Sequence, residues 1–64
     1  MISQTQQEMH PIDLRFKMGW TLQQLAAELG YSYQACLYWS SKRRNPSIHA
    51  REKAWLVWQK YQTN

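Results

Sequence analysis

The residues that could carry out catalysis or bind a metal are few and widely spaced. The chain of 64 residues holds four acidic residues, two histidines and one cysteine. They form no Ser/His/Asp set and no pair of carboxylates, and the spacing of His10 and His49 from Cys36 is not that of metal ligands. We therefore expect no enzymatic activity, no metal and no cofactor. Cys36 is expected to fill the core, and without a second cysteine for an internal disulfide it indicates a reducing, cytoplasmic protein.

The polar and basic side chains between residues 33 and 44 could instead bind a partner through hydrogen bonds and charge. Amide, phenol and guanidinium groups follow one another in this stretch and can hydrogen-bond base edges and phosphates. The net charge of +4 is also uneven, because residues 1–41 hold two basic and three acidic residues whereas residues 42–64 hold six basic and one acidic. The run Lys42-Arg43-Arg44 opens the basic part. It fits phosphate contacts beside a helix in a groove, and the alternative is a solvent-exposed loop.

Two short helices joined by a tight turn are predicted just before this basic run. Thr21 and Gln24 form a capping box, and apolar residues then recur at helical spacing. Gly30 can end that helix in a left-handed conformation, and Ser32 can cap a second helix that begins at Tyr33. So short a linker suits a sharp crossing of the two helices, as in a helix-turn-helix. An ordinary αα-hairpin is the alternative.

This segment resembles the Cro and phage-repressor class of helix-turn-helix domains, also called the XRE family. That family runs Thr-x-x-x-Leu-Ala-x-x-Leu-Gly-x-Ser, then a helix containing Trp, then a basic loop ending Arg-Asn-Pro-Ser. The residues that match without a gap are Thr21, Leu25, Ala26, Leu29, Gly30, Ser32, Trp39, Arg44, Asn45, Pro46 and Ser47. The resemblance covers roughly residues 11–47 and implies an all-α domain whose second motif helix enters the major groove of duplex DNA.

Three features depart from the family's pattern. Leu22 stands where the family often has a Gln that touches phosphate, and Lys42 stands where the loop usually has Gly. Residues 48–62 also have the pattern of one long helix, where the family normally continues with two short ones. The motif itself is kept, and the segment that follows it is different.

The second motif helix divides into two faces at about 100° per residue. Cys36 and Trp39 mark the core side. The opposite side holds the residues expected to contact bases, where Gln can bridge adenine and Leu can meet a thymine methyl group: Tyr33, Gln34, Leu37 and Tyr38. The family's base-reading residues also fall at the start and middle of this helix. The residues expected to contact phosphates are Thr21, Gln23, Ser41, Lys42, Arg43 and Arg44.

The last helix, capped by Ser47 or by Asn45, is apolar over about half of its surface. Ile48, Trp55 and Trp58 make one stripe, and Trp55 is expected to lie in the core. The adjacent stripe, which we expect to be the face of a homodimer, consists of Ala50, Ala54, Val57 and Tyr61. The alternative is that both stripes are buried inside a four-helix monomer.

Together these features predict one compact all-α domain over residues 10–64, preceded by a flexible arm over residues 1–9. Four helices are expected near residues 11–18, 21–29, 33–41 and 48–62. We expect sequence-specific binding of double-stranded DNA by a small, nucleoid-associated transcriptional regulator, a repressor of bacterial, phage or mobile-element type. No membrane and no small-molecule ligand is expected. The alternatives are a protein-interaction module on the same fold, such as an antirepressor or assembly adaptor, and an excisionase-like architectural factor.

Overall fold

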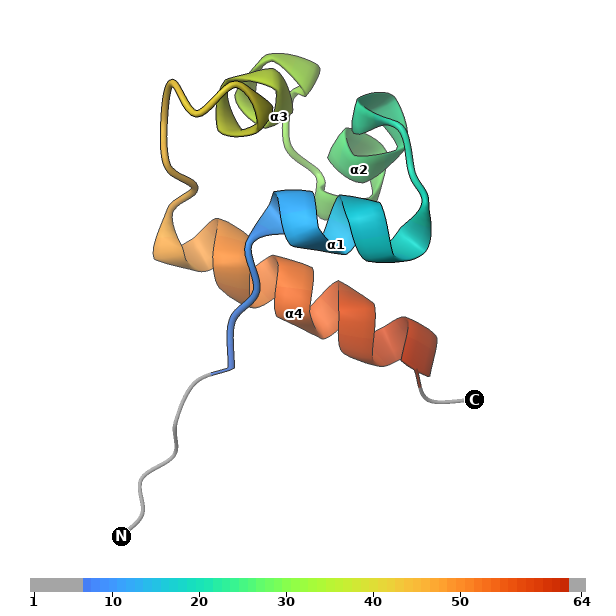
Figure 1. The fold of residues 1–64 in the computed structure, drawn as a ribbon. Helices are drawn as coiled ribbons and strands as arrows, with labels where there is room; N and C mark the ends of the chain where they lie inside the picture. The colour runs from blue at the N-terminus through green and yellow to red at the C-terminus, as the bar shows by residue number, and fades with distance from the viewer. Residues whose placement is uncertain (1–6, 63–64) are drawn as a thin grey trace, which may run out of the picture.

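This computed structural model describes residues 7–62 of the chain. Within that range the chain forms four helices. In chain order they are α1 (Pro11–Met18), α2 (Leu22–Leu29), α3 (Tyr33–Ser40) and α4 (Ile48–Gln62) (Figure 1). In the view of Figure 1, α4 runs below α1, whereas α2 and α3 lie above it, and α4 contacts both α1 and α2. The prediction of an all-α, four-helix domain is confirmed, and the predicted bounds agree with the observed ones to within one residue.

Each helix begins at a side chain that accepts a hydrogen bond from a backbone amide of the first turn. The acceptors are His10 Nδ1 for α1 at 3.1 Å, Thr21 Oγ1 for α2 at 3.1 Å, Ser32 Oγ for α3 at 3.1 Å and Ser47 Oγ for α4 at 3.2 Å. At α2 the capping box is complete, because the Thr21 amide also donates to Gln24 Oε1 at 2.8 Å. Such caps stabilise a helix by about 1 kcal/mol each, so the helix starts are determined by local sequence.

The ends of the first three helices lie close to residues with a positive φ. Gly19 after α1 (φ 69°) and Gly30 after α2 (φ 75°) adopt the left-handed conformation, which glycine takes without steric cost. After α3 the left-handed residue is Lys42 (φ 65°), at the position where the family usually has glycine. A lysine there carries a steric cost of about 1 kcal/mol, and the loop adopts this conformation in spite of it.

All four helices contribute to a single small core. The buried hydrophobic residues are Leu14, Leu25, Ala26, Leu29, Cys36, Trp39, Ala50, Ala54 and Val57. Cys36 is buried, as expected for a core residue, and burial raises the pKa of its thiol. Trp39 is the largest of these side chains, and its ring makes an edge-to-face contact with Tyr31 at 5.3 Å between centroids.

Three of the four residues predicted to form a dimer face on α4 line the core instead, and the fourth, Tyr61, is 41% exposed. Ala50 and Ala54 are fully buried and Val57 is almost so. Tyr61 packs against Trp20, with the two rings 5.7 Å apart, and partial burial and then the charge of Glu28 raise the pKa of its phenol. The small alanine side chains let α4 approach α1 and α2 closely, so Ala50, Ala54 and Val57 face inward and not toward a second molecule.

The other stripe of α4 is only partly internal. Trp58 packs against the edge of the core, where the Lys17 ammonium lies 5.4 Å from its ring centroid. Trp55, expected in the core, is half-buried and lies outside the core cluster, and Ile48 is 47% exposed. The core of so short a chain has room for one stripe of α4, and the stripe with the smaller side chains occupies it.

The segment before α1 is attached to α4 where the structure describes it. The Met9 amide donates to the Arg51 carbonyl oxygen at 3.1 Å, and the Arg51 guanidinium lies 3.4 Å from the Glu8 carboxylate. The side chain of Met9 packs against the core, so the domain begins before residue 10. The remainder of the predicted arm, residues 1–6, lies outside the described residues.

Candidate nucleic-acid interface

The turn between α2 and α3 fixes how α3 is presented. Gly30 ends α2, and the amides of Gly30 and Tyr31 both donate to the Ala26 carbonyl oxygen, at 2.8 and 3.1 Å. Ser32 then starts α3 at once. The small Ala26 is buried between the helices, and α3 packs on α2 and α1 through Cys36 and Trp39. The opposite side of α3 therefore faces solvent.

That outer side of α3 carries the residues predicted to contact bases. Tyr33 is 47% exposed, Gln34 is exposed and Leu37 is 38% exposed. Leu37 lies one turn after Tyr33 and Gln34 on this side of the helix, and within residues 7–62 no side-chain hydrogen bond or ring contact engages Gln34 or Leu37. Tyr38, the fourth predicted residue, is half-buried at the edge of this face. The structure thus brings all four together, with Tyr38 less accessible than the other three.

Tyr38 organises the basic loop that follows α3. Its carbonyl oxygen accepts the backbone amides of Arg43 at 2.9 Å and Arg44 at 3.5 Å, and the Ser41 hydroxyl at 3.3 Å. Its ring lies under the Arg44 guanidinium, with 5.3 Å between the Arg44 Cζ and the ring centroid. The side chain of Tyr38 therefore supports a cation, a role that was not predicted, because it depends on the loop turning back over α3.

The three cations of the loop lie at the end of the exposed face of α3. Lys42, Arg43 and Arg44 are all exposed, and the αL conformation of Lys42 turns the chain so that the arginine amides return to the last turn of the helix. Ser41 is also exposed, but its hydroxyl hydrogen is used by the Tyr38 carbonyl. Phosphate contact by Ser41 would require this hydroxyl to reorient, because a phosphate only accepts hydrogen bonds.

A second set of candidate contacts surrounds the start of α2. Thr21 and Gln23, both predicted to meet phosphates, line a hollow of about 360 Å³ together with Tyr33 of α3. Arg15 of α1 lines the same hollow and was not among the predicted site residues. Its Cζ lies 5.1 Å from the Phe16 ring centroid, and its Nε is buried without a hydrogen-bond partner. The crossing of α1 and α2 brings Arg15 here, and its own sequence neighbourhood gives no sign of it.

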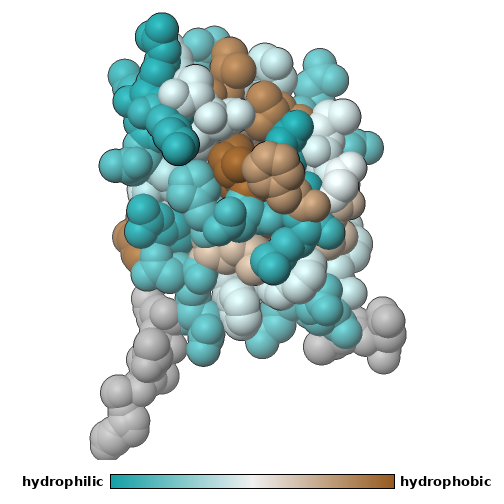
Figure 2. Space-filling model, viewed as in Figure 1, coloured by the Kyte–Doolittle hydropathy of each residue, from teal (hydrophilic) through white to brown (hydrophobic). Residues whose placement is uncertain are grey.

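Apolar side chains are also exposed on this part of the surface. Figure 2 shows hydrophobic side chains gathered over α1 and continuing toward α3, with hydrophilic side chains around them. Phe16 of α1 is 69% exposed, the highest value among the large hydrophobic residues in the described part. The candidate interface is therefore mixed, with apolar groups available for base methyl groups or for a protein partner.

Other kinds of site find no support in the described part of the chain. Residues 7–62 contain no group of three or more His, Cys, Asp and Glu residues that could hold a metal ion. No helix within that range combines the length and the apolar character needed to cross a bilayer. In comparisons with known proteins, no family model, no curated protein sequence and no solved structure matches this chain. The resemblance to the XRE family therefore stays a prediction from the residues that carry it.

Proposed function

We propose that this protein binds double-stranded DNA sequence-specifically as a small transcriptional regulator, with α3 as the recognition helix in the major groove. One observation carries the proposal: the exposed face of α3 presents Gln34 and Leu37 unengaged and ends in the exposed cations Lys42, Arg43 and Arg44. A groove-binding helix needs this combination, because base edges lie along the groove and phosphates lie at its rims. DNA as the partner would place the protein in the cytoplasm, associated with the nucleoid.

Each group has a defined task in this proposal. Gln34 hydrogen-bonds a base edge, and Leu37 contacts a thymine methyl group. Arg43 and Arg44 contact phosphates on one side of the groove, with Arg44 preorganised by its stacking on Tyr38. Thr21, Gln23 and Arg15 contact phosphates on the other side, where the amides at the start of α2 also favour an anion.

The phosphate contacts can be tested through the salt dependence of binding. We expect affinity to fall steeply with salt, and the double variant Arg43→Ala/Arg44→Ala to reduce the slope of log K against log[salt] by about 2, because each lost contact removes about 0.9. Fluorescence anisotropy on a short duplex measures both slopes. The double variant Lys17→Ala/Lys53→Ala removes the same charge from α1 and α4 and serves as the control. Equal slopes for the two double variants would contradict the assignment of the loop.

Base reading can be tested at Gln34. We expect Gln34→Ala to weaken the preference at one base pair by about 1–3 kcal/mol while leaving non-specific binding nearly unchanged, because a side chain that reads a base contributes only at its own position. A site is first selected from a random duplex library with the wild type, and each base pair is then substituted in turn. A loss of equal size on every sequence would show that Gln34 positions the protein on the backbone.

The exposed apolar band over α1 and α3 supports a second candidate function. A protein-interaction module, such as an antirepressor or assembly adaptor, would use Phe16 and Leu37 as apolar anchors. This candidate predicts no duplex binding even at low salt, where the basic loop would otherwise give measurable affinity. An excisionase-like architectural factor would bind the duplex and bend it, which a change in the mobility of circularly permuted fragments would detect.

A further inference from the structure

The outer face of α4 is an apolar surface that the proposed DNA interface does not use. Leu56 is 59% exposed and Ile48 is 47% exposed, although both lie on a helix whose opposite side forms part of the core. They stand two turns apart, so they belong to one stripe along the helix, with Glu52 between them. Trp55 adds a half-buried indole at the edge of the same stripe.

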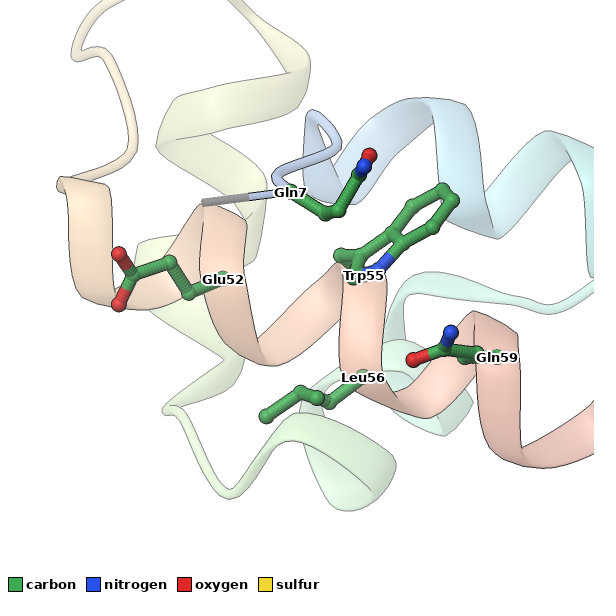
Figure 3. A pocket seen from close by; sticks show the side chains of 5 residues that line it. All are labelled: Gln7, Glu52, Trp55, Leu56 and Gln59. Atoms are coloured by element: carbon green, nitrogen blue, oxygen red, sulfur yellow. The ribbon is translucent and has the colours of Figure 1, made fainter. Parts of the chain in front are cut away.

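This stripe is hollowed where Trp55 and Leu56 diverge. A pocket of about 320 Å³ is lined by Gln7, Glu52, Trp55, Leu56 and Gln59. Glu52 and Leu56 project to the same side from successive turns of α4, and Trp55 lies beside Gln7 of the N-terminal segment (Figure 3). The hollow is open and its lining is mixed, with Trp55 and Leu56 supplying an apolar part that suits a projecting aliphatic side chain such as leucine.

The charges on either side of Leu56 are opposite in sign. Glu52 lies four residues before Leu56 and Lys60 lies four residues after it, so both share the side of α4 that Leu56 occupies. When two α4 helices pair antiparallel about Leu56, each Glu52 faces the Lys60 of the second copy. Parallel pairing would instead place like charges together. The stripe is therefore self-complementary, as a two-fold interface requires.

The position of α4 determines what such a dimer could do. No Cα atom of α3 lies within 8 Å of one in α4, and the core lies between the two helices. The outer face of α3 and the outer face of α4 therefore point away from each other (Figure 1). Two copies joined through α4 would hold their recognition helices at opposite ends of the dimer. Binding to two adjacent half-sites needs both recognition helices on the same side.

We propose that a second copy of this chain docks antiparallel on the outer face of α4, and that the dimer bridges two separate DNA segments. The bridging part rests on the proposed function of α3, whereas the pairing of α4 does not. α4 is about 22 Å long, so the interface is small and we expect a weak association. Bound DNA raises the local concentration of the protein and so favours pairing between neighbouring complexes.

The pairing is tested by sedimentation equilibrium of the whole chain. We expect a monomer–dimer equilibrium for the wild type and at least a tenfold weaker one for Leu56→Glu, because two glutamates would meet at the centre of the interface. Ala27→Glu puts the same charge on an exposed apolar residue of α2 and is the control for self-association, which it should leave unchanged. Glu52→Lys should weaken the dimer, and the double variant Glu52→Lys/Lys60→Glu should restore it, since antiparallel pairing brings the exchanged charges together again.

Bridging is tested with two duplexes of about 12 base pairs, each too short for two domains side by side. One is fixed to beads and the other carries a fluorophore. We expect wild type to capture the labelled duplex, and Leu56→Glu to lose capture while it still binds a single duplex.

Three results would overturn the proposal. They are a wild type that stays monomeric at millimolar concentration, a failed rescue by the charge exchange, and capture that survives Leu56→Glu. If dimers form but neither the wild type nor any variant binds DNA, the proposed function and the bridging are both contradicted. The pairing through α4 is then still supported.

Discussion

At the scale of single residues, the backbone conformation at Lys42 favours glycine, whereas the candidate interface favours a cation at this position. Its φ of 65° suits glycine, yet the chain places a cation there, next to Arg43 and Arg44. A side chain in the left-handed region is retained at a steric cost when its chemistry is needed. The charge of Lys42 at the end of α3 is the feature that glycine would not supply.

Substitution of Lys42 separates these two preferences. Lys42→Gly and Lys42→Ala remove the same charge, but only glycine relieves the strain, so we expect the glycine variant to be more stable than the alanine variant by about 1 kcal/mol. Both variants should bind duplex DNA more weakly, with the salt slope reduced by about 1. Urea unfolding measures the first effect and anisotropy the second. Equal stability of the two variants would show that the loop changes its conformation when the lysine is lost.

At the scale of the secondary-structure elements, local sequence predicts where each helix lies but not which way each one faces. The helix bounds followed from caps such as Thr21 and Ser32 and from Gly30, all of which act within one turn. The phase of α4 could not be predicted in the same way, since both of its stripes are apolar. Tertiary packing decided it: Ala54 fits against α1 and α2, and the bulky Trp55 stays at the edge.

In the candidate site, too, some positions could be predicted from local sequence and others depend on tertiary contacts. The outer face of α3 was predictable because Cys36 and Trp39 fix its inner face, which leaves Gln34 and Leu37 outside. The positions of Arg15 and Arg44 relative to this face depend on contacts between segments that are apart in sequence or joined by an irregular loop. Arg15 was missed for that reason, and the stacking of Arg44 on Tyr38 was missed as well.

At the scale of the whole molecule, the four helices share one core, so the domain is expected to unfold as a unit. α3 contributes Cys36 and Trp39 to that core, and α1, α2 and α4 supply the residues that surround them. α3 cannot leave its place without exposing Trp39, the largest buried side chain of the described residues. Binding at the outer face of α3 and the stability of the core are therefore coupled, because DNA would bind only the folded state.

Because Cys36 is buried, the rate at which its thiol is labelled can measure how often the domain opens. The only thiol of the chain lies on the inner face of α3 and has no exposed surface, so a disulfide reagent can reach it only when the domain opens. We expect the labelling rate to report the open fraction and to fall by the factor 1 + [DNA]/Kd as duplex is added. Time-resolved mass spectrometry of the native chain measures it, with Cys36→Ala/Gln62→Cys as the exposed-thiol control. A rate unchanged by saturating duplex would mean that Cys36 is reached without opening of the domain, or that the DNA does not bind the folded state.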